Sequence, residues 1–104
     1  MSAWEKLGIV VAAVAGMEAF AWAAHRWIMH GPGWAWHRDH HEPHDRVLER
    51  NDLYAVVFGA AVIALFLVGL RWSPALWWTA VGITVYGAIY TAIHDGIVHG
   101  RWFR

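Results

Sequence analysis

Three long apolar runs constrain this chain more than any other feature of its sequence. They are Leu7 to Ala24, in which Glu18 is the only charge, and Leu53 to Leu70 and Ala75 to Ile93, which carry none. A helix needs about 20 apolar residues to cross a hydrocarbon core of about 30 Å. The runs are too long for strands and are apolar on every side, unlike the helices of a soluble bundle. We therefore predict an all-α integral membrane helical bundle with three transmembrane helices.

Two other interpretations of the runs are weaker. A soluble helical bundle of 104 residues, 59% of them hydrophobic, could hardly cover so much apolar surface. A signal peptide fits Lys6 ahead of the first run, but not Glu18 inside it or the histidines that follow directly. The whole chain, residues 1–104, is therefore expected to be a single membrane domain.

Composition excludes several kinds of function. The formal net charge is zero and no basic stripe is present, so nucleic acid is not an expected partner. The chain has no cysteine, which excludes disulfides, zinc-thiolate sites and iron–sulfur clusters. Any metal must be held by nitrogen or oxygen.

Turn-forming residues separate the runs. The Gly-Pro-Gly triplet at 31–33 is expected to end the first helix, because proline has no N–H and glycine favours turns. Asn51 or Asp52 is placed to cap the second helix. The Ser-Pro pair at 73–74 is placed to start the third after a tight turn.

Basic residues predict the orientation. With three spans, the loop over residues 26–52 and the tail after Ile93 lie on the same side. That side holds Arg26, Arg38, Arg46, Arg50, Arg101 and Arg104. The other side holds only Lys6 and Arg71, so the positive-inside rule makes the first side cytoplasmic. The eight histidines fall on or next to that cytoplasmic side: His25, His30, His37, His40, His41, His44, His94 and His99.

The stretch HRDHHEPH at 37–44 concentrates these histidines. A short helix over Trp34 to Glu42 would place three of them at i, i+3 and i+4 on one face. These three are His37, His40 and His41. Pro43 is expected to end or break that helix, which makes His44 a weaker candidate.

A short repeat links the ends of the first and third spans. HRWIMHG at 25–31 matches HDGIVHG at 94–100. Histidines five residues apart lie about 140° apart around an ideal α-helix, so such a pair is expected to line a site between helices or to serve two ions. Imidazole suits iron, zinc and copper. The clusters together predict a metal site at the membrane surface, although any one histidine taken alone is equally well explained as an interfacial anchor.

Acidic and aromatic residues complete the candidate site. Four acids lie close enough in sequence to accept hydrogen bonds from ligand imidazoles: Asp39, Glu42, Asp45 and Asp95. Glu18 precedes His25 by seven residues, and an acid inside a span predicts either a role at the site or a structural hydrogen bond. Tyr86 and Tyr90 precede His94 at four-residue steps, as expected for a wall of a ligand cleft or for helix packing.

The segments HRWIMHG, WHRDHHEPH, NDLYAVVF and HDGIVHGRW together resemble the bacterial β-carotene hydroxylase family, within the membrane-bound fatty acid hydroxylase and sterol desaturase superfamily. The resemblance runs from about Glu18 to the end of the chain. It implies a cytoplasm-facing centre of two non-haem iron ions held by histidine motifs. The implied ligands are His25, His30, His37, His40, His41, His94 and His99. Further candidates, as ligands or as hydrogen-bond partners of ligands, are His44, Glu18, Asp39 and Asp95.

The reaction implied by the resemblance is O2-dependent 3-hydroxylation of β-ionone rings, from β-carotene through cryptoxanthin to zeaxanthin. The carotenoid would come from the bilayer, and the electrons from reduced ferredoxin or a similar donor. Zinc would not substitute for iron, because it has no redox chemistry. Family members continue into another hydrophobic segment and a final H-x-x-H-H motif, so a domain truncated at its C-terminus is expected here.

Two rival functions remain open at this point. One is a b-type haem protein for electron transfer, held by histidines from separate spans, although axial ligation does not need the tight H-x-x-H-H group. The other is a truncated, non-catalytic membrane protein that binds metal or carotenoid.

Overall fold

The computed structural model describes residues 1–42, 46 and 48–98, with the backbone alone at 95, 96 and 98. The described part of the chain is helical and contains no strand, as predicted. Its helices are α1 (Ala3–Ala24), η1 (His25–Met29), α2 (Trp34–His41), α3 (Asp52–Trp72), α4 (Pro74–Tyr90) and η2 (Thr91–Val98). The elements η1 and η2 are π-helical and continue α1 and α4 without a break.

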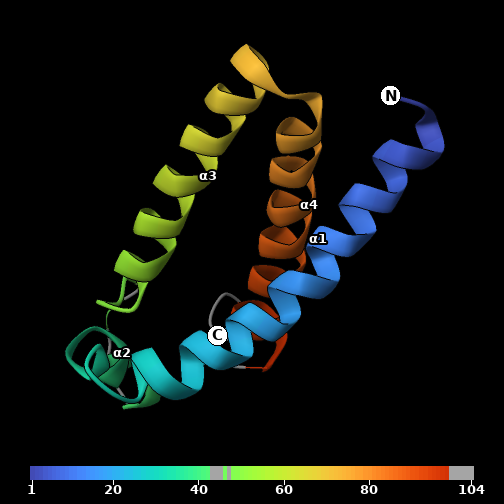
Figure 1. Cartoon of the computed structure of the whole chain (residues 1–104). Coiled ribbons are helices and arrows are strands. Elements are labelled where there is room, and N and C mark those ends of the chain that lie inside the picture. The colour runs from blue at the N-terminus through green and yellow to red at the C-terminus, as the bar shows by residue number, and fades with distance from the viewer. Residues whose placement is uncertain (43–45, 47, 99–104) are drawn as a thin grey trace.

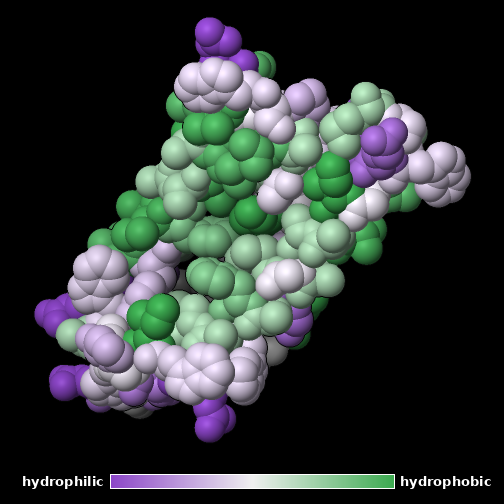
Figure 2. All heavy atoms as spheres, in the orientation of Figure 1, coloured by the Kyte–Doolittle hydropathy of each residue, from purple (hydrophilic) through white to green (hydrophobic). Residues whose placement is uncertain are grey.

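Three of the helical stretches are long and apolar enough to cross a membrane: Ala3–Met29, Asp52–Trp72 and Pro74–His94. A helix of 21 residues is about 32 Å long, close to the thickness of a hydrocarbon core. The side chains of these helices lie mainly on the surface; Leu67 and Leu70, for example, are 62% and 73% exposed. Figure 2 shows a hydrophobic band over these helices, with hydrophilic groups at the ends. The three predicted spans are confirmed, and the chain is an integral membrane protein.

The helix α4 is the centre of the bundle (Figure 1). It packs against α1 on one side and α3 on the other, whereas α1 and α3 do not contact each other within the described residues. At the crossing with α1, a Cβ on Gly82 would lie 2.6 Å from Cβ of Ala13 and 2.8 Å from the carbonyl oxygen of Val10. The absence of a side chain at 82 therefore allows the two helix backbones to approach closely.

Most of the predicted helix ends are confirmed. Ser73 Oγ accepts a hydrogen bond from the Leu76 backbone N–H at 3.4 Å, with Pro74 in the first position of α4. The triplet at 31–33 forms a turn, and α2 ends at His41 with Glu42 in the extended conformation that a following proline favours.

The start of α3 differs from the prediction. Asn51 is the residue before the helix, but its side chain makes no capping hydrogen bond. Its amide oxygen instead reaches a histidine on α2, while the Asp52 carboxylate accepts from the Glu49 backbone N–H at 2.9 Å. The residues that looked like a helix cap therefore tie the loop before α3 to the histidine-rich helix α2.

Candidate metal centre

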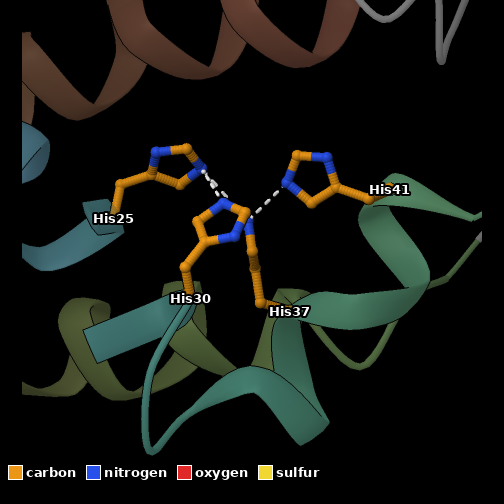
Figure 3. Close-up of side chains that lie close together, drawn as sticks. All are labelled: His25, His30, His37 and His41. Atoms are coloured by element: carbon orange, nitrogen blue, oxygen red, sulfur yellow. Dashed lines mark hydrogen bonds between the residues drawn. The ribbon is translucent and has the colours of Figure 1, made fainter. Parts of the chain in front are cut away.

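Four imidazole rings converge at one end of the bundle, on the segments η1, the turn after it and α2 (Figure 3). They are His25, His30, His37 and His41, and we call them the four-histidine group. One potential ligand nitrogen from each lies within 4.8 Å of those of the other three. The Nε2 atom of His25 lies 3.1 Å from that of His30 and 3.1 Å from that of His37, and Nε2 of His41 lies 2.7 Å from that of His37.

The π-helix η1 explains how His25 and His30 meet. The His30 backbone N–H donates to the His25 carbonyl oxygen at 3.2 Å, five residues earlier. A π-helix pairs residues i and i+5, so two side chains at this spacing come together instead of lying about 140° apart. The rings are 4.5 Å apart between centroids. The expectation from an ideal α-helix is therefore wrong at this point, because the helix changes its winding where the histidines begin.

The helix α2 supplies the other two members. His37 and His41 are four residues apart and so lie on the same helix face. His37 is 2% exposed, whereas His41 and His30 lie at the surface. The group is therefore buried on the side of His37 and open on the opposite side.

A hydrogen bond sets the tautomer of His37. Its Nδ1 donates to the amide oxygen of Asn51 at 2.6 Å, which leaves the lone pair on Nε2. Burial lowers the pKa of His37 to about 4, although the hydrogen bond to Asn51 opposes this shift. At neutral pH the ring is thus uncharged and directs a lone pair into the four-histidine group, which is the state that binds a metal.

The donor set and spacing suit a metal ion. Two imidazole nitrogens bound at right angles to one metal, each at about 2.1 Å, would be about 3.0 Å apart. The nearest Nε2 pairs in the group are 2.7 to 3.1 Å apart. Neutral imidazole is a ligand for iron, zinc and copper. The four-histidine group therefore fits a first-row metal ion, and iron is among those it fits.

His40 and His94 form a second pair beside this group. Their Nε2 atoms are 3.3 Å apart, and the ring of His40 lies 5.7 Å from that of His37 between centroids. Nδ1 of His40 is 2.9 Å from the carboxylate of Glu49, and both side chains are almost fully buried. A carboxylate in this place fixes Nδ1 as the protonated nitrogen and turns the Nε2 lone pair of His40 toward His94.

Two of the sequence-predicted acids, Asp39 and Glu42, contact arginine side chains. The Asp39 carboxylate accepts from the backbone N–H of Arg50 at 2.7 Å and of Asn51 at 3.4 Å, and it forms an ion pair with Arg46 at 3.1 Å. Asp39 therefore holds the loop that presents Glu49 and Asn51 to the histidines. Glu42 forms an exposed ion pair with Arg38 at 3.2 Å.

The remaining predicted site residues are partly outside the described structure. His44, Asp45 and His99 lie outside the described residues, and the side chain of Asp95 is not among those described. Glu18 accepts a hydrogen bond from the Tyr86 hydroxyl at 2.9 Å. Asn51 and Glu49 were not predicted as partners of the histidines, because both lie in a loop far from them in sequence.

An aromatic stack runs along α4 and η2, from the hydrogen bond between Glu18 and Tyr86 to His94. The rings of Tyr86 and Tyr90 are 5.9 Å apart, and those of Tyr90 and His94 are 4.8 Å apart and inclined by only 14°. Beside the stack lies a pocket of about 220 Å³ lined by Glu18, Tyr86, Ile89, Tyr90, Ile93 and His94. The tyrosines were predicted to flank the site or a ligand cleft, or to pack between helices. Both line this pocket, and Tyr86 is also buried between α1 and α4, whereas Tyr90 is 38% exposed.

Comparison with known proteins gives a consistent result. Residues 10–104 match the model of the fatty acid hydroxylase family. The chain is 60% identical over 95 residues to a β-carotene hydroxylase of Paracoccus sp. (strain N81106 / MBIC 01143), covering 90% of this chain and 59% of that protein. It is 50% identical over 99 residues to a β-carotene hydroxylase of Pantoea ananas, covering 95% and 56%.

A plant relative is more distant. The chain is 40% identical over 96 residues to the chloroplastic β-carotene 3-hydroxylase 1 of Arabidopsis thaliana, covering 88% of this chain and 31% of that protein. The chain thus spans 59% or less of the length of these curated relatives. No solved structure matches it at a significant level.

Proposed function

Because the chain belongs to the fatty acid hydroxylase family, we propose that it acts as a β-carotene 3-hydroxylase that uses O2 and non-haem iron to convert β-carotene to zeaxanthin. The observation that carries the proposal is the convergence of imidazoles from η1, α2 and η2 at one end of an apolar helical bundle. The names of the relatives support the substrate class.

The proposed ligands fall into two adjacent sets. The four-histidine group would hold one iron ion, and His40 with His94 would contribute to a second. His99, which lies outside the described residues, is a further proposed ligand. Such iron ions, when bound, supply the redox chemistry that activates O2 and hydroxylates an unactivated ring carbon. The chain itself orients the ligands: Asn51 and Glu49 hold the Nδ1 atoms of His37 and His40, so that both Nε2 lone pairs face the metal positions.

The apolar helices would deliver the substrate. β-Carotene dissolves in the hydrocarbon core, where the exposed apolar side chains of α1, α3 and α4 lie. His94 is one of the residues that line the pocket beside Tyr90, so a ring that enters this pocket would lie next to the second pair of histidines.

The proposed location is the bacterial inner membrane, with the histidines on the cytoplasmic side. Arg26, Arg38, Arg46 and Arg50 lie at the histidine end, and only Lys6 and Arg71 lie at the other end among the described residues. A reduced ferredoxin or a similar carrier would then reach the site from the cytoplasm.

Iron content and product formation test the proposal together. Protein purified from membranes in mild detergent is expected to contain two non-haem iron ions per chain and no haem absorption band. Cells that accumulate β-carotene are expected to form zeaxanthin when they express the protein.

His40→Ala is expected to abolish zeaxanthin formation while the protein still inserts into the membrane. Arg38→Ala is the matched control on the same helix, since its side chain is 62% exposed. Zeaxanthin formation by His40→Ala would refute the ligand assignment. A haem band would favour electron transfer, and metal binding without product would favour a non-catalytic protein.

A further inference from the structure

An acid inside a membrane-spanning helix forms a hydrogen bond across the bundle. The Tyr86 hydroxyl on α4 donates to Oε2 of Glu18 on α1 at 2.9 Å. Tyr86 is 9% exposed, so its ring is enclosed where the two helices meet. An ionisable side chain within a span is energetically expensive, and its usual explanation is function.

Glu18 has more hydrogen-bonding capacity than Tyr86 uses. A carboxyl group offers about four acceptor positions, and the tyrosine hydroxyl takes one of them. Glu18 is exposed, and it lines the pocket that runs along Tyr90 to His94. A hydroxyl group inside the pocket would therefore find an acceptor at this end.

The rest of the pocket suits an apolar ring. Ile89 and Ile93 line it with aliphatic side chains, and Tyr90 contributes an aromatic one. An apolar cavity of about 150 Å³ is large enough to bind benzene. A pocket of about 220 Å³ therefore has room for one substituted six-membered ring.

We propose that Glu18, held in place by Tyr86, binds a hydroxyl group on a terminal ring, so that the pocket holds a hydroxylated ring more tightly than an unmodified one. This inference rests on the proposed function, because a ring hydroxyl is the group that the proposed reaction adds. The ring hydroxyl donates to Glu18, and the hydrogen bond from Tyr86 holds the Glu18 carboxyl in place. Glu18 thereby distinguishes the product ring from the substrate ring.

Direct binding of three small probes tests the site. The full chain is purified in mild detergent, and no reductant is added, so no turnover takes place. Equilibrium dialysis then measures the affinity for β-ionone, 3-hydroxy-β-ionone and the methyl ether of the latter. The alcohol is expected to bind about tenfold more tightly than the other two, because only the alcohol can donate a hydrogen bond to Glu18.

Glu18→Met removes the carboxyl group and keeps a side chain of similar length. This variant is expected to bind all three probes equally, because it offers the alcohol no acceptor at this position. Thr79→Val is the matched control on α4, since its hydroxyl bonds to the Ala75 carbonyl outside the pocket; it is expected to keep the tenfold preference. A preference that survives Glu18→Met would overturn the proposal.

The wild-type protein decides the question even if Glu18→Met does not fold. Equal affinity for the alcohol and β-ionone, no binding of either, or an ether that binds as tightly as the alcohol would each overturn the proposal. Iron and zeaxanthin formation without the hydroxyl preference would refute the binding site alone. The preference without iron would refute the proposed function alone.

Discussion

Nδ1 of His37 donates a hydrogen bond to the amide oxygen of Asn51 across 2.6 Å. The two residues are separated by the loop between α2 and α3, and Asp39 holds that loop by accepting from the backbone N–H groups of Arg50 and Asn51. The most buried histidine of the four-histidine group is therefore oriented by a residue from another helix end. Ligand geometry at this site depends on how the loop folds back on α2.

Replacing Asn51 with leucine is expected to weaken metal binding by the four-histidine group about 10- to 100-fold, because His37 loses the acceptor that fixes its tautomer. Competition with a chelator measures the affinity. Asn51→Asp keeps an acceptor oxygen and is expected to retain most of the wild-type affinity for metal. Helix content by circular dichroism should stay unchanged in both variants, since the Asn51 side chain does not cap α3. Unchanged affinity in Asn51→Leu would show that this hydrogen bond does not tune the site.

Glu49→Leu is expected to act on the other pair of histidines. Glu49 is buried against Nδ1 of His40, and its removal leaves that nitrogen without its acceptor while the four-histidine group keeps Asn51. We expect iron content to fall by about half and zeaxanthin formation to be lost. Metal analysis of the purified protein measures the iron content. Glu49→Gln retains an acceptor oxygen, so its iron content should be nearer to that of the wild type. Equal loss of iron from both positions would contradict the assignment of Glu49 to one of them.

The contact between Gly33 and Tyr54 predicts a coupled pair of substitutions. The Tyr54 hydroxyl donates to the Gly33 carbonyl at 2.6 Å, and a Cβ on Gly33 would collide with that hydroxyl. Tyr54→Phe is expected to lower the free energy of unfolding by about 1 kcal/mol, and Gly33→Ala by about 1–3 kcal/mol.

The double variant tests the contact itself. Gly33→Ala is expected to be less damaging in the Tyr54→Phe background, because the hydroxyl that it strikes is gone. Unfolding in detergent measures all four proteins. If the changes in unfolding free energy of the two single variants simply add up in the double variant, the methyl group at 33 does not press on the Tyr54 hydroxyl.

The spans were predictable because their signal is local. Length and hydropathy placed them at residues 7–24, 53–70 and 75–93, and the helices α1, α3 and α4 cover nearly the same ranges. The proline and glycine residues at 31–33 and the Ser73–Pro74 pair act on their own neighbours, so their effects can be predicted without knowledge of the fold.

The assembly of the site was not predictable in the same way. No local pattern marks the change from α- to π-winding at His25, and that change is what brings His25 and His30 together. His40 shares a helix with His37 and His41, yet it turns to Glu49 and His94, which lie 9 and 54 residues away. Sequence spacing therefore identified the candidate ligands, but the helix geometry and the loop fold divide them into two sets.

Gly82 lies where α1 and α4 approach closely, and these two helices lead to histidines of the two sets. A methyl group at 82 would press on Ala13 and the Val10 backbone, so Gly82→Ala is expected to separate α1 from α4 and to lower the unfolding free energy by about 1–3 kcal/mol. Gly87→Ala is the matched control on the same helix, where the new methyl would lie in ordinary contact with Phe58 at 3.9 Å.

Thermal unfolding in detergent compares the two variants. Because α1 continues into η1 with His25 and α4 continues into η2 with His94, we also expect Gly82→Ala to lower the affinity for metal, whereas Gly87→Ala should leave it unchanged. Equal stability of the two variants would show that α1 shifts along α4 at little cost, and that the close approach at Gly82 does not position the histidines.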